Sequence, residues 1–284
     1  MTAYKKQHWL PACYMKFFSK SGKPQGRNSE IYYSDAIESK VDRVKNLSYD
    51  DFHYSEDDPE AAETSFHAME NDYPNIVEKL LRGEVLNRKE YYGLLLTMID
   101  FHARNPSYLN LTEKENYKAF EIVSQGLMNE VFKDCDSNGN DFKKMLNFMQ
   151  NNWELQPVCS PKEELFSSDH PSLLFSINDK LAFIFLPITP HYGLVAVDKR
   201  EIEIISDEIS EEDNGILNSI QAQVCIKYVY SNIELSEFIG EEKPLTKTLK
   251  KEIPSGYVTT DVWKPEYIDY PGKIPSEFSF LKIR

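Results

Sequence analysis

Apolar residues separated by three or four positions run from Phe66 to Leu80 and predict an amphipathic helix. Pro59 and the acidic residues before it suit the first turn of that helix, and Gly83 is a natural stop. Pro74 lies inside the pattern, so we expect it to kink or split the helix.

The same spacing predicts more helices along the chain. One ends before Asn105, because the proline that follows disfavours helical backbone at that residue. Another begins with the capping-box pair Thr112 and Glu115. The predicted helices after the first therefore cover about 91–104, 112–133, 141–153 and 211–230.

Past Pro157 the pattern changes to short aliphatic and aromatic runs separated by turn residues. The runs LLFSI, LAFIFLPI, YGLVAVD and EIEII predict four strands in an antiparallel meander. Near the N-terminus, alternation around Trp9–Phe17 and the segment 31–35 predict a hairpin.

Helices followed by strands are typical of an α+β fold. We expect a helical N-terminal half packed on a small, mostly antiparallel sheet in one compact domain. The alternative is a separate all-helical half beside a β-rich half. The preferred organisation is one domain over 1–240, with a helical part at 57–153, a β-rich part at 157–205, a closing helix at 211–230 and an extended, aromatic C-terminal wrap at 241–284.

Composition excludes some classes of protein. The 284 residues are 41% hydrophobic, enough to build a core, so a wholly disordered chain is ruled out. The 32 Lys and Arg against 46 Asp and Glu give a net charge of −14, which disfavours extended duplex nucleic acid or an anionic membrane as partner. A protein partner, or a small or single-stranded substrate, stays open.

The N-terminus has no apolar run of signal-peptide length, and no stretch approaches the ~18 apolar residues of a membrane span. Four cysteines lie scattered, without the spacing of metal ligands. We expect reduced, mostly buried thiols in a cytoplasmic protein; a disulfide or a catalytic thiol is the alternative.

Several familiar motifs are missing from the sequence. It contains no GxxxxGK[ST], GxGxxG, GxSxG or HExxH pattern. The run from Asp134 to Gly139 begins like an EF-hand loop, but Met145 stands where the bidentate carboxylate is required. We therefore expect a polar loop there.

Polar residues that interrupt apolar faces are the best candidates for chemistry. Glu63, His67 and Glu70 form one stripe on the first helix, and apolar neighbours predict that Glu70 is at least half buried. A buried carboxylate needs a cation, a metal ion or a raised pKa. His102 and Arg104 on the next helix are candidate partners, in either an Arg–Glu bridge between helices or a functional pocket.

Two other clusters have similar alternatives. Ser168 and Asp169 form either an ordinary turn, with Asp169 bonded to backbone N–H groups, or the edge of a pocket. A triad with His170 is unlikely, because adjacent strand residues point to opposite faces. His8 and Tyr14 belong to an HxxPxxYxxxF pattern that either packs the N-terminal segment or presents His8 as an acid or base.

Several short motifs occur in one order along the chain, and together they resemble the bacterial family named domain of unknown function 4238, up to about residue 235. The motifs are HWLPACYMKFFS at 8–19, ETSFHAME at 63–70, DFHARNP at 100–106, LFSSDHPSLLFS at 165–176 and FLPITPHYGLVAV at 185–197. The resemblance implies an architecture but no activity. It places the family's polar positions on His8, Glu63, Glu70, Arg104, Ser168 and Asp169.

Two hypotheses follow. The first is a small metal-assisted hydrolase or nuclease acting in bacterial conflict or phage defence. Its catalytic residues would be His8, Glu70, Arg104 and Asp169, with Glu70 and Asp169 holding a divalent cation; Tyr14, Glu63 and Ser168 would bind substrate. The second is a non-enzymatic protein-binding or scaffolding module in which the same residues form a buried structural network. Convergence of the four catalytic candidates in one open cleft would favour the enzyme.

Overall fold

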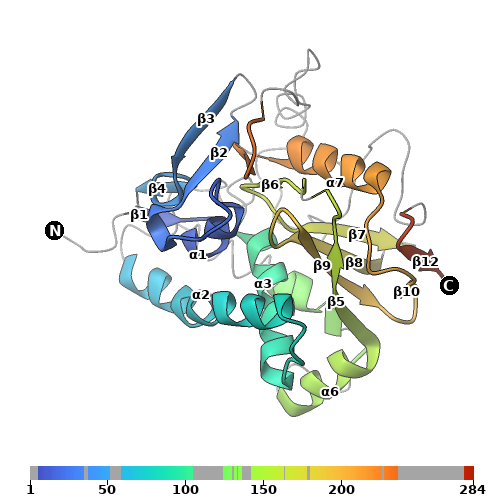
Figure 1. Ribbon diagram of the computed structural model, residues 1–284. Coiled ribbons are helices and arrows are strands. Elements are labelled where there is room, and N and C mark those ends of the chain that lie inside the picture. Colours follow the sequence, from blue (N-terminus) through green and yellow to red (C-terminus); the bar gives the residue numbers. More distant parts are fainter. Residues whose placement is uncertain are drawn as a thin grey trace.

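The fold is built around a four-stranded antiparallel sheet with the strand order β5-β9-β8-β7 (Figure 1). Its strands are β5 (Trp153–Cys159), β7 (Leu173–Ile177), β8 (Lys180–Pro187) and β9 (Tyr192–Asp198). The computed structural model describes residues 6–34, 38–51, 59–104, 124–129, 131–132, 134–135, 142–162, 164–177, 180–225, 227–235 and 278–284. Strands β7, β8 and β9 confirm three of the four predicted strands.

Strand β5 lies at the edge of this sheet and was not predicted. Its register pairs Trp153 with Asp198 and Cys159 with Tyr192. Pro157 is tolerated because an edge strand leaves one row of N–H groups without a neighbouring strand. Because proline is rare inside strands, the sequence did not indicate β5. Trp153, which was predicted to end the preceding helix, is the first residue of β5.

A second four-stranded sheet, with the order β3-β2-β11-β6, collects segments from distant parts of the chain. It contains β2 (Glu30–Ser34), β3 (Ser39–Arg43), β6 (Ser167–Ser168) and β11 (Val229–Ser231). Strand β11 pairs with both β2 and β6, and every pairing is antiparallel. The mixed α+β class is thus correct, but the expected split into a helical first half and a β-rich second half is wrong, because the sheets interleave the two halves.

Two short strand pairs complete the β structure. Near the N-terminus, β1 (Lys6–His8) pairs with β4 (Tyr49–Asp51). At the other end, β10 (Ile202–Ile204) pairs with β12 (Leu281–Ile283). The predicted fourth strand of the meander therefore exists but joins the C-terminal residues instead of the main sheet. Residues 241–277 of the expected wrap lie outside the described part, and the domain bounds stay predictions.

The periodic segments form helices as expected. They are α2 (Pro59–Leu81), α3 (Arg88–Ala103), α6 (Phe142–Asn152) and α7 (Glu211–Val224). Pro74 does not split α2. Asn87 caps α3 with a capping box, and the Ser210 side chain accepts from the Asp213 N–H at the start of α7. The predicted helix 112–133 is described only in part, and residues 124–129 of it are helical.

The predicted hairpin at the N-terminus is wrong, although the strand predicted at 31–35 is confirmed by β2. Residues 12–18 form the short helix α1 (Ala12–Met15) and the 3-10 helix η1 (Lys16–Phe18), and β2 pairs with β3 and β11 instead. Pro11 precedes α1, a position that suits a helix start, and a helical turn buries Tyr14 and Phe18 together. Two more 3-10 helices are η2 (Gly26–Asn28) and η3 (Val44–Asn46).

Two hydrophobic cores lie on opposite faces of the main sheet. Along β9, Leu194 and Ala196 belong to the first core, which contains residues of the N-terminal segment, α2 and α3. Val195 and Val197 belong to the second core, with residues of α7 and the C-terminal Phe280. The alternation of β9 side chains thus places the N-terminal elements, α2 and α3 on one face and α7 on the other (Figure 1).

Candidate functional site

The packing of α2 against α3 brings Glu70 to Arg104. Arg104 is the C-cap of α3, and its Nη1 donates to Glu70 Oε1 at 2.7 Å. The Nε of the same guanidinium lies 2.7 Å from Oδ2 of Asp100, one helical turn earlier. The guanidinium carbon also lies 3.7 Å from the centroid of the Phe66 ring. Arg104 is therefore held by two carboxylates and an aromatic face.

Burial differs sharply within this cluster. The Arg104 side chain is fully buried, whereas that of Glu70 is 26% exposed. Burial raises the pKa of Asp100 to about 6 despite the opposing charge of Arg104. Burial also raises the pKa of the Cys13 thiol to about 12, with the charge of Glu70 acting in the same direction. The side chain of Glu70 is more exposed than that of either Asp100 or Arg104.

His8 lies at the end of β1, within electrostatic reach of Glu70. Burial, together with the charge of Arg27, lowers the pKa of His8 to about 4, although a hydrogen bond with the Lys45 backbone and the charge of Glu70 act the other way. The imidazole is therefore neutral near pH 7. Its Nε2 is buried and has no hydrogen-bond partner among the described residues. A buried acceptor without a partner calls for an explanation.

Two tyrosines lie on the inner side of this cluster. Tyr73 is fully buried, burial raises its pKa, and its hydroxyl has no hydrogen bond within the described part of the chain. The Tyr14 hydroxyl donates to the Pro187 carbonyl at 2.6 Å and lies 2.7 Å from Ser167 Oγ. Tyr14 thus joins α1 to the two sheets, and the substrate-binding role predicted for it stays a prediction.

Ser168 and Asp169 form a second polar cluster. Asp169 Oδ2 accepts from the N–H groups of Lys227 and Tyr228 at 2.8 and 3.3 Å. Ser168 Oγ donates to Gln221 Oε1 at 2.6 Å and accepts from the His170 N–H. Both residues are buried. One alternative from the sequence was a turn in which Asp169 bonds to nearby backbone N–H groups. The carboxylate does accept from backbone N–H groups, but these lie in the distant segment that leads into β11.

The N-terminal segment and a buried histidine pair connect the two clusters. On α3, His102 Nδ1 lies 2.9 Å from Nε2 of His170, next to Asp169. Burial lowers the pKa of His102 to about 4 and that of His170 well below its usual value. Beside His8, the ring of Trp9 lies 4.8 Å from Lys227 Nζ. The buried members of the predicted set, Arg104, Ser168 and Asp169, thus belong to a polar layer between the helices and the second sheet.

The structure brings only some of the predicted residues into direct contact. Glu70 contacts Arg104, and the charge of Glu70 acts to raise the pKa of His8. Among the described residues no hydrogen bond or ion pair joins Asp169 to Glu70, and their joint role as ligands of a cation stays a prediction. In that part of the chain no group of three or more His, Cys, Asp and Glu side chains is arranged to hold a metal ion. The side chain of Glu63 lies outside the described residues.

The sequence-based list omitted three residues of the site. Asp100 precedes Arg104 by four positions, which is the spacing of a helical ion pair, and that signal was available. Phe66 was recognised only as an apolar position. Cys13 gave no sequence signal, since its place beside Glu70 depends on how α1 packs against α2.

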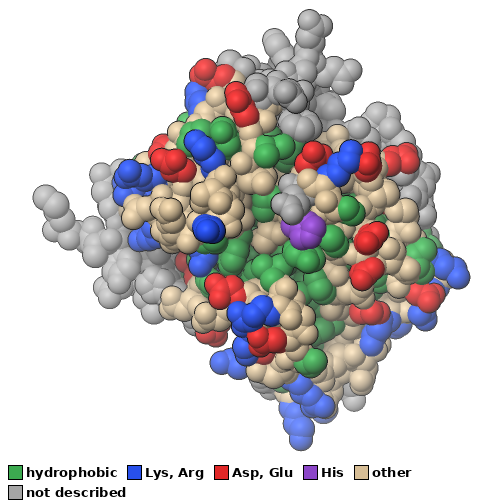
Figure 2. All heavy atoms as spheres, in the orientation of Figure 1, with side chains coloured by type: hydrophobic (Ala, Val, Ile, Leu, Met, Phe, Trp, Pro, Cys, Tyr) green, Lys and Arg blue, Asp and Glu red, His purple; other side chains and the backbone are tan. Residues whose placement is uncertain are grey.

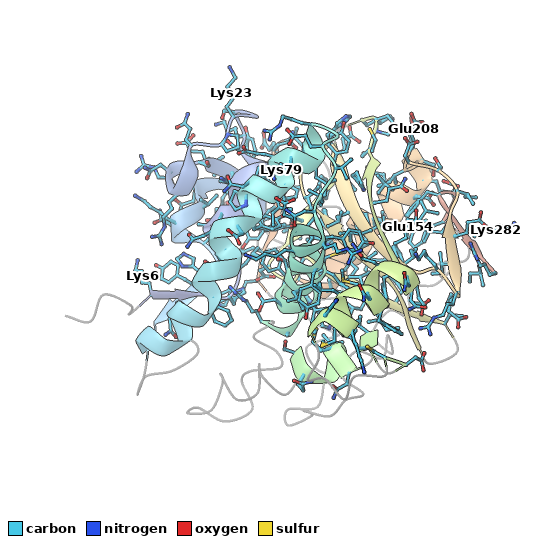
Figure 3. All side chains as sticks on the ribbon, turned by 90° about the horizontal axis from the view of Figure 1, so that it is seen from below. Lys6, Lys23, Lys79, Glu154, Glu208 and Lys282 are labelled. Carbon is cyan, nitrogen blue, oxygen red and sulfur yellow. The ribbon has the colours of Figure 1, made fainter. Side chains whose placement is uncertain are left out.

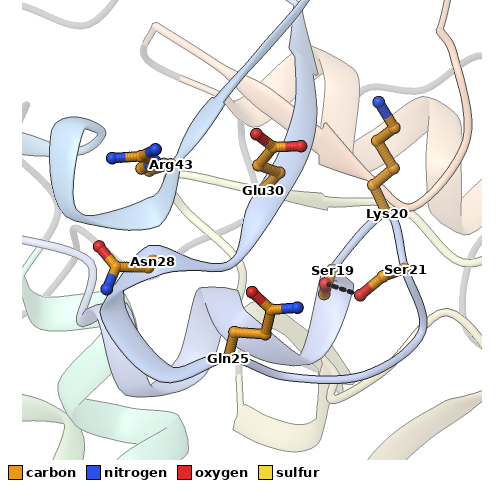
Figure 4. Close-up of a pocket in the computed structure, with 7 residues that line it drawn as sticks. All are labelled: Ser19, Lys20, Ser21, Gln25, Asn28, Glu30 and Arg43. Atoms are coloured by element: carbon orange, nitrogen blue, oxygen red, sulfur yellow. Dashed lines mark hydrogen bonds between the residues drawn. The ribbon is translucent and has the colours of Figure 1, made fainter.

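An open polar hollow of about 580 Å³ lies elsewhere, between the loop after η1 and the second sheet (Figure 4). In Figure 4, Lys20 and Arg43 lie on either side of Glu30, so its charges are mixed. None of the predicted site residues lines it. The candidate site is therefore the partly exposed Glu70 and its buried neighbours, not this hollow.

Acidic side chains are prominent on part of the surface, as the net charge of −14 leads one to expect. In Figure 2, Asp and Glu predominate over α7 and β10, and Lys and Arg are interspersed over the N-terminal elements. Arg104 and Asp169 are buried, so the charge of the surface comes from other side chains. No helix in the described ranges is both long and apolar enough to cross a bilayer.

Comparison with known proteins identifies one relationship. No curated protein and no solved structure matches the chain. A family model, described as protein of unknown function DUF4238, matches residues 6–234, which is most of the chain and includes every predicted site residue. The chain therefore belongs to the DUF4238 family.

Proposed function

We propose that the chain is a small hydrolase whose reaction centre contains His8 and Glu70. The observation that carries the proposal is that Nε2 of a neutral, partly buried imidazole has no hydrogen-bond partner among the described residues, while the ring lies within electrostatic reach of the partly exposed Glu70 carboxylate. An imidazole whose other nitrogen is fixed by a backbone hydrogen bond is a common arrangement for a general base.

In this proposal Glu70 holds the attacking water and His8 accepts a proton from it. With a pKa near 4, His8 is a weak base in the resting protein. An anionic substrate beside the ring would raise that pKa, because it stabilises the imidazolium. The substrate that fits is a phosphate ester or the end of a single-stranded nucleic acid, because the acidic surface repels a long polyanion more strongly than a short one.

Arg104 acts as a positioning residue in this scheme. Its guanidinium is fully buried and already holds Glu70 and Asp100, so it orients the carboxylate instead of gripping a phosphate. The same guanidinium, 2.7 Å from Glu70, weakens the attraction of that carboxylate for a divalent cation. The proposal still includes a divalent cation with Glu70 as one of its ligands, and the assay below tests this by adding manganese or a chelator. In the cell, we propose that the protein acts in the cytoplasm as a nuclease in bacterial conflict or phage defence.

One observation favours the second candidate function, a non-enzymatic protein-binding module. Arg104, Asp169 and the His102–His170 pair are sealed in contacts that join helices to sheet. If these contacts serve only stability, function would rest on the acidic surface and its protein partners.

A substrate panel separates the two candidates. The full chain is assayed with a chromogenic phosphomonoester, a phosphodiester and single-stranded oligonucleotides, each with chelator and with manganese. We expect hydrolysis of at least one substrate, and His8→Gln should lower the rate by about 100-fold, which is typical for loss of a general base.

The matched control is His191→Gln, which removes a partly exposed histidine whose ring contacts Cys159 and Ser160. Its hydrolysis rate should equal that of the unaltered protein. Absence of hydrolysis across the panel, or equal rates for both variants, would favour the binding module.

A further inference from the structure

Cys159 and His191 meet at one end of the main sheet, where β5 ends and β9 begins. Cys159 Sγ lies 3.4 Å from His191 Nε2. The backbone of Cys159 also forms an isolated parallel β-bridge with Glu208. Figure 3 labels Glu208 on the side of the molecule opposite Lys6 and Lys23. Both residues are partly exposed, so the pair borders solvent.

The imidazole of His191 is held in one orientation. Its Nδ1 lies 2.8 Å from the Ser160 carbonyl oxygen, which can only accept, so Nδ1 carries the hydrogen. Nε2 therefore presents its lone pair to the Cys159 thiol. Thr189 Oγ1 accepts from the N–H groups of His191 and Tyr192 at 3.1 and 2.9 Å, which fixes the turn that carries the ring.

We propose that Cys159 is a reactive thiol, activated by His191, that forms mixed disulfides with low-molecular-weight disulfides. The Sγ proton passes to His191 Nε2, and the thiolate attacks one sulfur of the disulfide R–S–S–R. A bond forms between Cys159 Sγ and that sulfur, the original S–S bond breaks, and the second sulfur leaves as a thiolate that takes the proton from His191. Cys159 is oxidised and the small disulfide is reduced.

Disulfide exchange fits this site better than acyl transfer. Acyl transfer by a cysteine needs N–H donors for an oxyanion. The amide of Cys159 donates to the Asp207 carbonyl at 2.6 Å, and that of Ser160 donates to the His191 carbonyl at 2.7 Å. Exchange at sulfur develops no oxyanion, so it proceeds with these amides engaged.

The other cysteines and nearby charges define the comparison. Cys13 has its pKa raised to about 12 by burial, and Cys225 is buried, so neither competes at neutral pH. Cys135 is partly exposed like Cys159 and is the matched control. Asp207 and Glu208, on the segment paired with Cys159, oppose thiolate formation; the activation therefore depends on His191.

The test uses the full chain, reduced and then exposed at pH 7 to an aromatic disulfide or to glutathione disulfide. Peptide mass spectrometry follows the order in which the cysteines are modified. We expect Cys159 first, ahead of Cys135, and a rate roughly tenfold lower in His191→Gln, reflecting the smaller thiolate fraction. Cys135→Ser should leave the fast phase intact, and Cys159→Ser should abolish it.

Two results would overturn the proposal. One is modification of Cys135 before Cys159 in the unaltered protein, a result that needs no variant to fold. The other is an unchanged rate in a His191→Gln protein whose melting temperature is also unchanged. Neither result bears on the hydrolase proposal, since His8 and Glu70 take no part in the reaction at Cys159.

Discussion

Arg104 shows how much of the site follows from single residues. The apolar neighbours of Glu70 predicted a half-buried carboxylate with a cationic partner on the next helix, and the 2.7 Å contact with Arg104 agrees with that expectation. Asp100 was not recognised, although it precedes Arg104 by four positions, which is the spacing of a helical ion pair. Which residues face one another across α2 and α3 depends on helix packing, which single-residue reasoning does not provide.

Removal of Arg104 should destabilise the fold strongly. Arg104→Leu leaves the buried Asp100 carboxylate without its cation, and loss of one partner of a buried pair costs about 3–5 kcal/mol. The free energy of unfolding, measured with denaturant, tests this. The matched control is Arg82→Leu, since Arg82 pairs with Glu84 on the surface and should cost about 1 kcal/mol or less. Equal losses in the two variants would contradict a sealed ion pair.

Acid should destabilise the protein below pH 6.5. Burial lowers the pKa of both His8 and His102 from 6.5 to about 4, so the unfolded chain binds more protons between these values. Their contribution to stability is full above pH 6.5 and falls as the pH drops toward 4. Asp100, with its pKa raised to about 6, acts in the opposite direction between pH 6 and 4, but it is one group against several.

Denaturant unfolding at pH 7, 6, 5 and 4 measures this dependence. His102→Gln should flatten the curve, because it removes one group that the fold holds neutral. A free energy of unfolding that stays constant or rises between pH 6.5 and 4 would mean that the histidines are not held neutral.

At the scale of elements, length decides what the sequence could predict. Helices α2, α3 and α6 span several turns, so their period was recognisable and their bounds were close. Strands β1, β4 and β6 have two or three residues, too few for an alternation to show. They are strands because distant segments pair with them, and such pairing is not encoded locally.

The N-terminal segment is the element that joins the site together. Residues 6–18 contact both α2 and the second sheet, and Tyr14 anchors them through Ser167 and Pro187. Tyr14→Phe keeps the ring and leaves the buried Pro187 carbonyl without its donor. We expect a loss of about 1–3 kcal/mol in unfolding free energy.

Tyr14→Phe also separates two roles for this residue. If Tyr14 is an anchor, stability falls while the hydrolysis rate of the folded protein stays nearly unchanged. A large loss of rate at full stability would instead restore the substrate-binding role that the sequence suggested. The control is Tyr192→Phe, whose partly exposed hydroxyl has no hydrogen bond in the described structure.

At the scale of the whole molecule, two cores share one sheet. The sequence predicted the α+β class and most strands of the main sheet, but it did not reveal the second sheet, which joins residues 30–34 to 167–168 through 229–231. The C-terminal residues close the second core, where Phe278 and Phe280 pack around Phe183. The aromatic content of the tail was the signal that these residues pack.

Phe280→Ala should therefore destabilise the molecule as a whole. The side chain is fully buried, and truncating a buried phenylalanine costs about 3–5 kcal/mol. Thermal melting of the full chain measures the effect, with the exposed Val85→Ala as control. A melting temperature equal to that of the control would show that the C-terminal residues are not part of the core.

The measurement that most directly tests the reaction centre is the hydrolysis rate of Glu70→Gln, with its unfolding free energy taken on the same preparation. Glutamine keeps an oxygen that accepts from Arg104 but loses the charge that would hold and polarise water. A catalytic Glu70 predicts a rate lower by about 100-fold with a protein that still folds. An unchanged rate together with a large loss of stability would contradict the reaction centre and assign the cluster to structure.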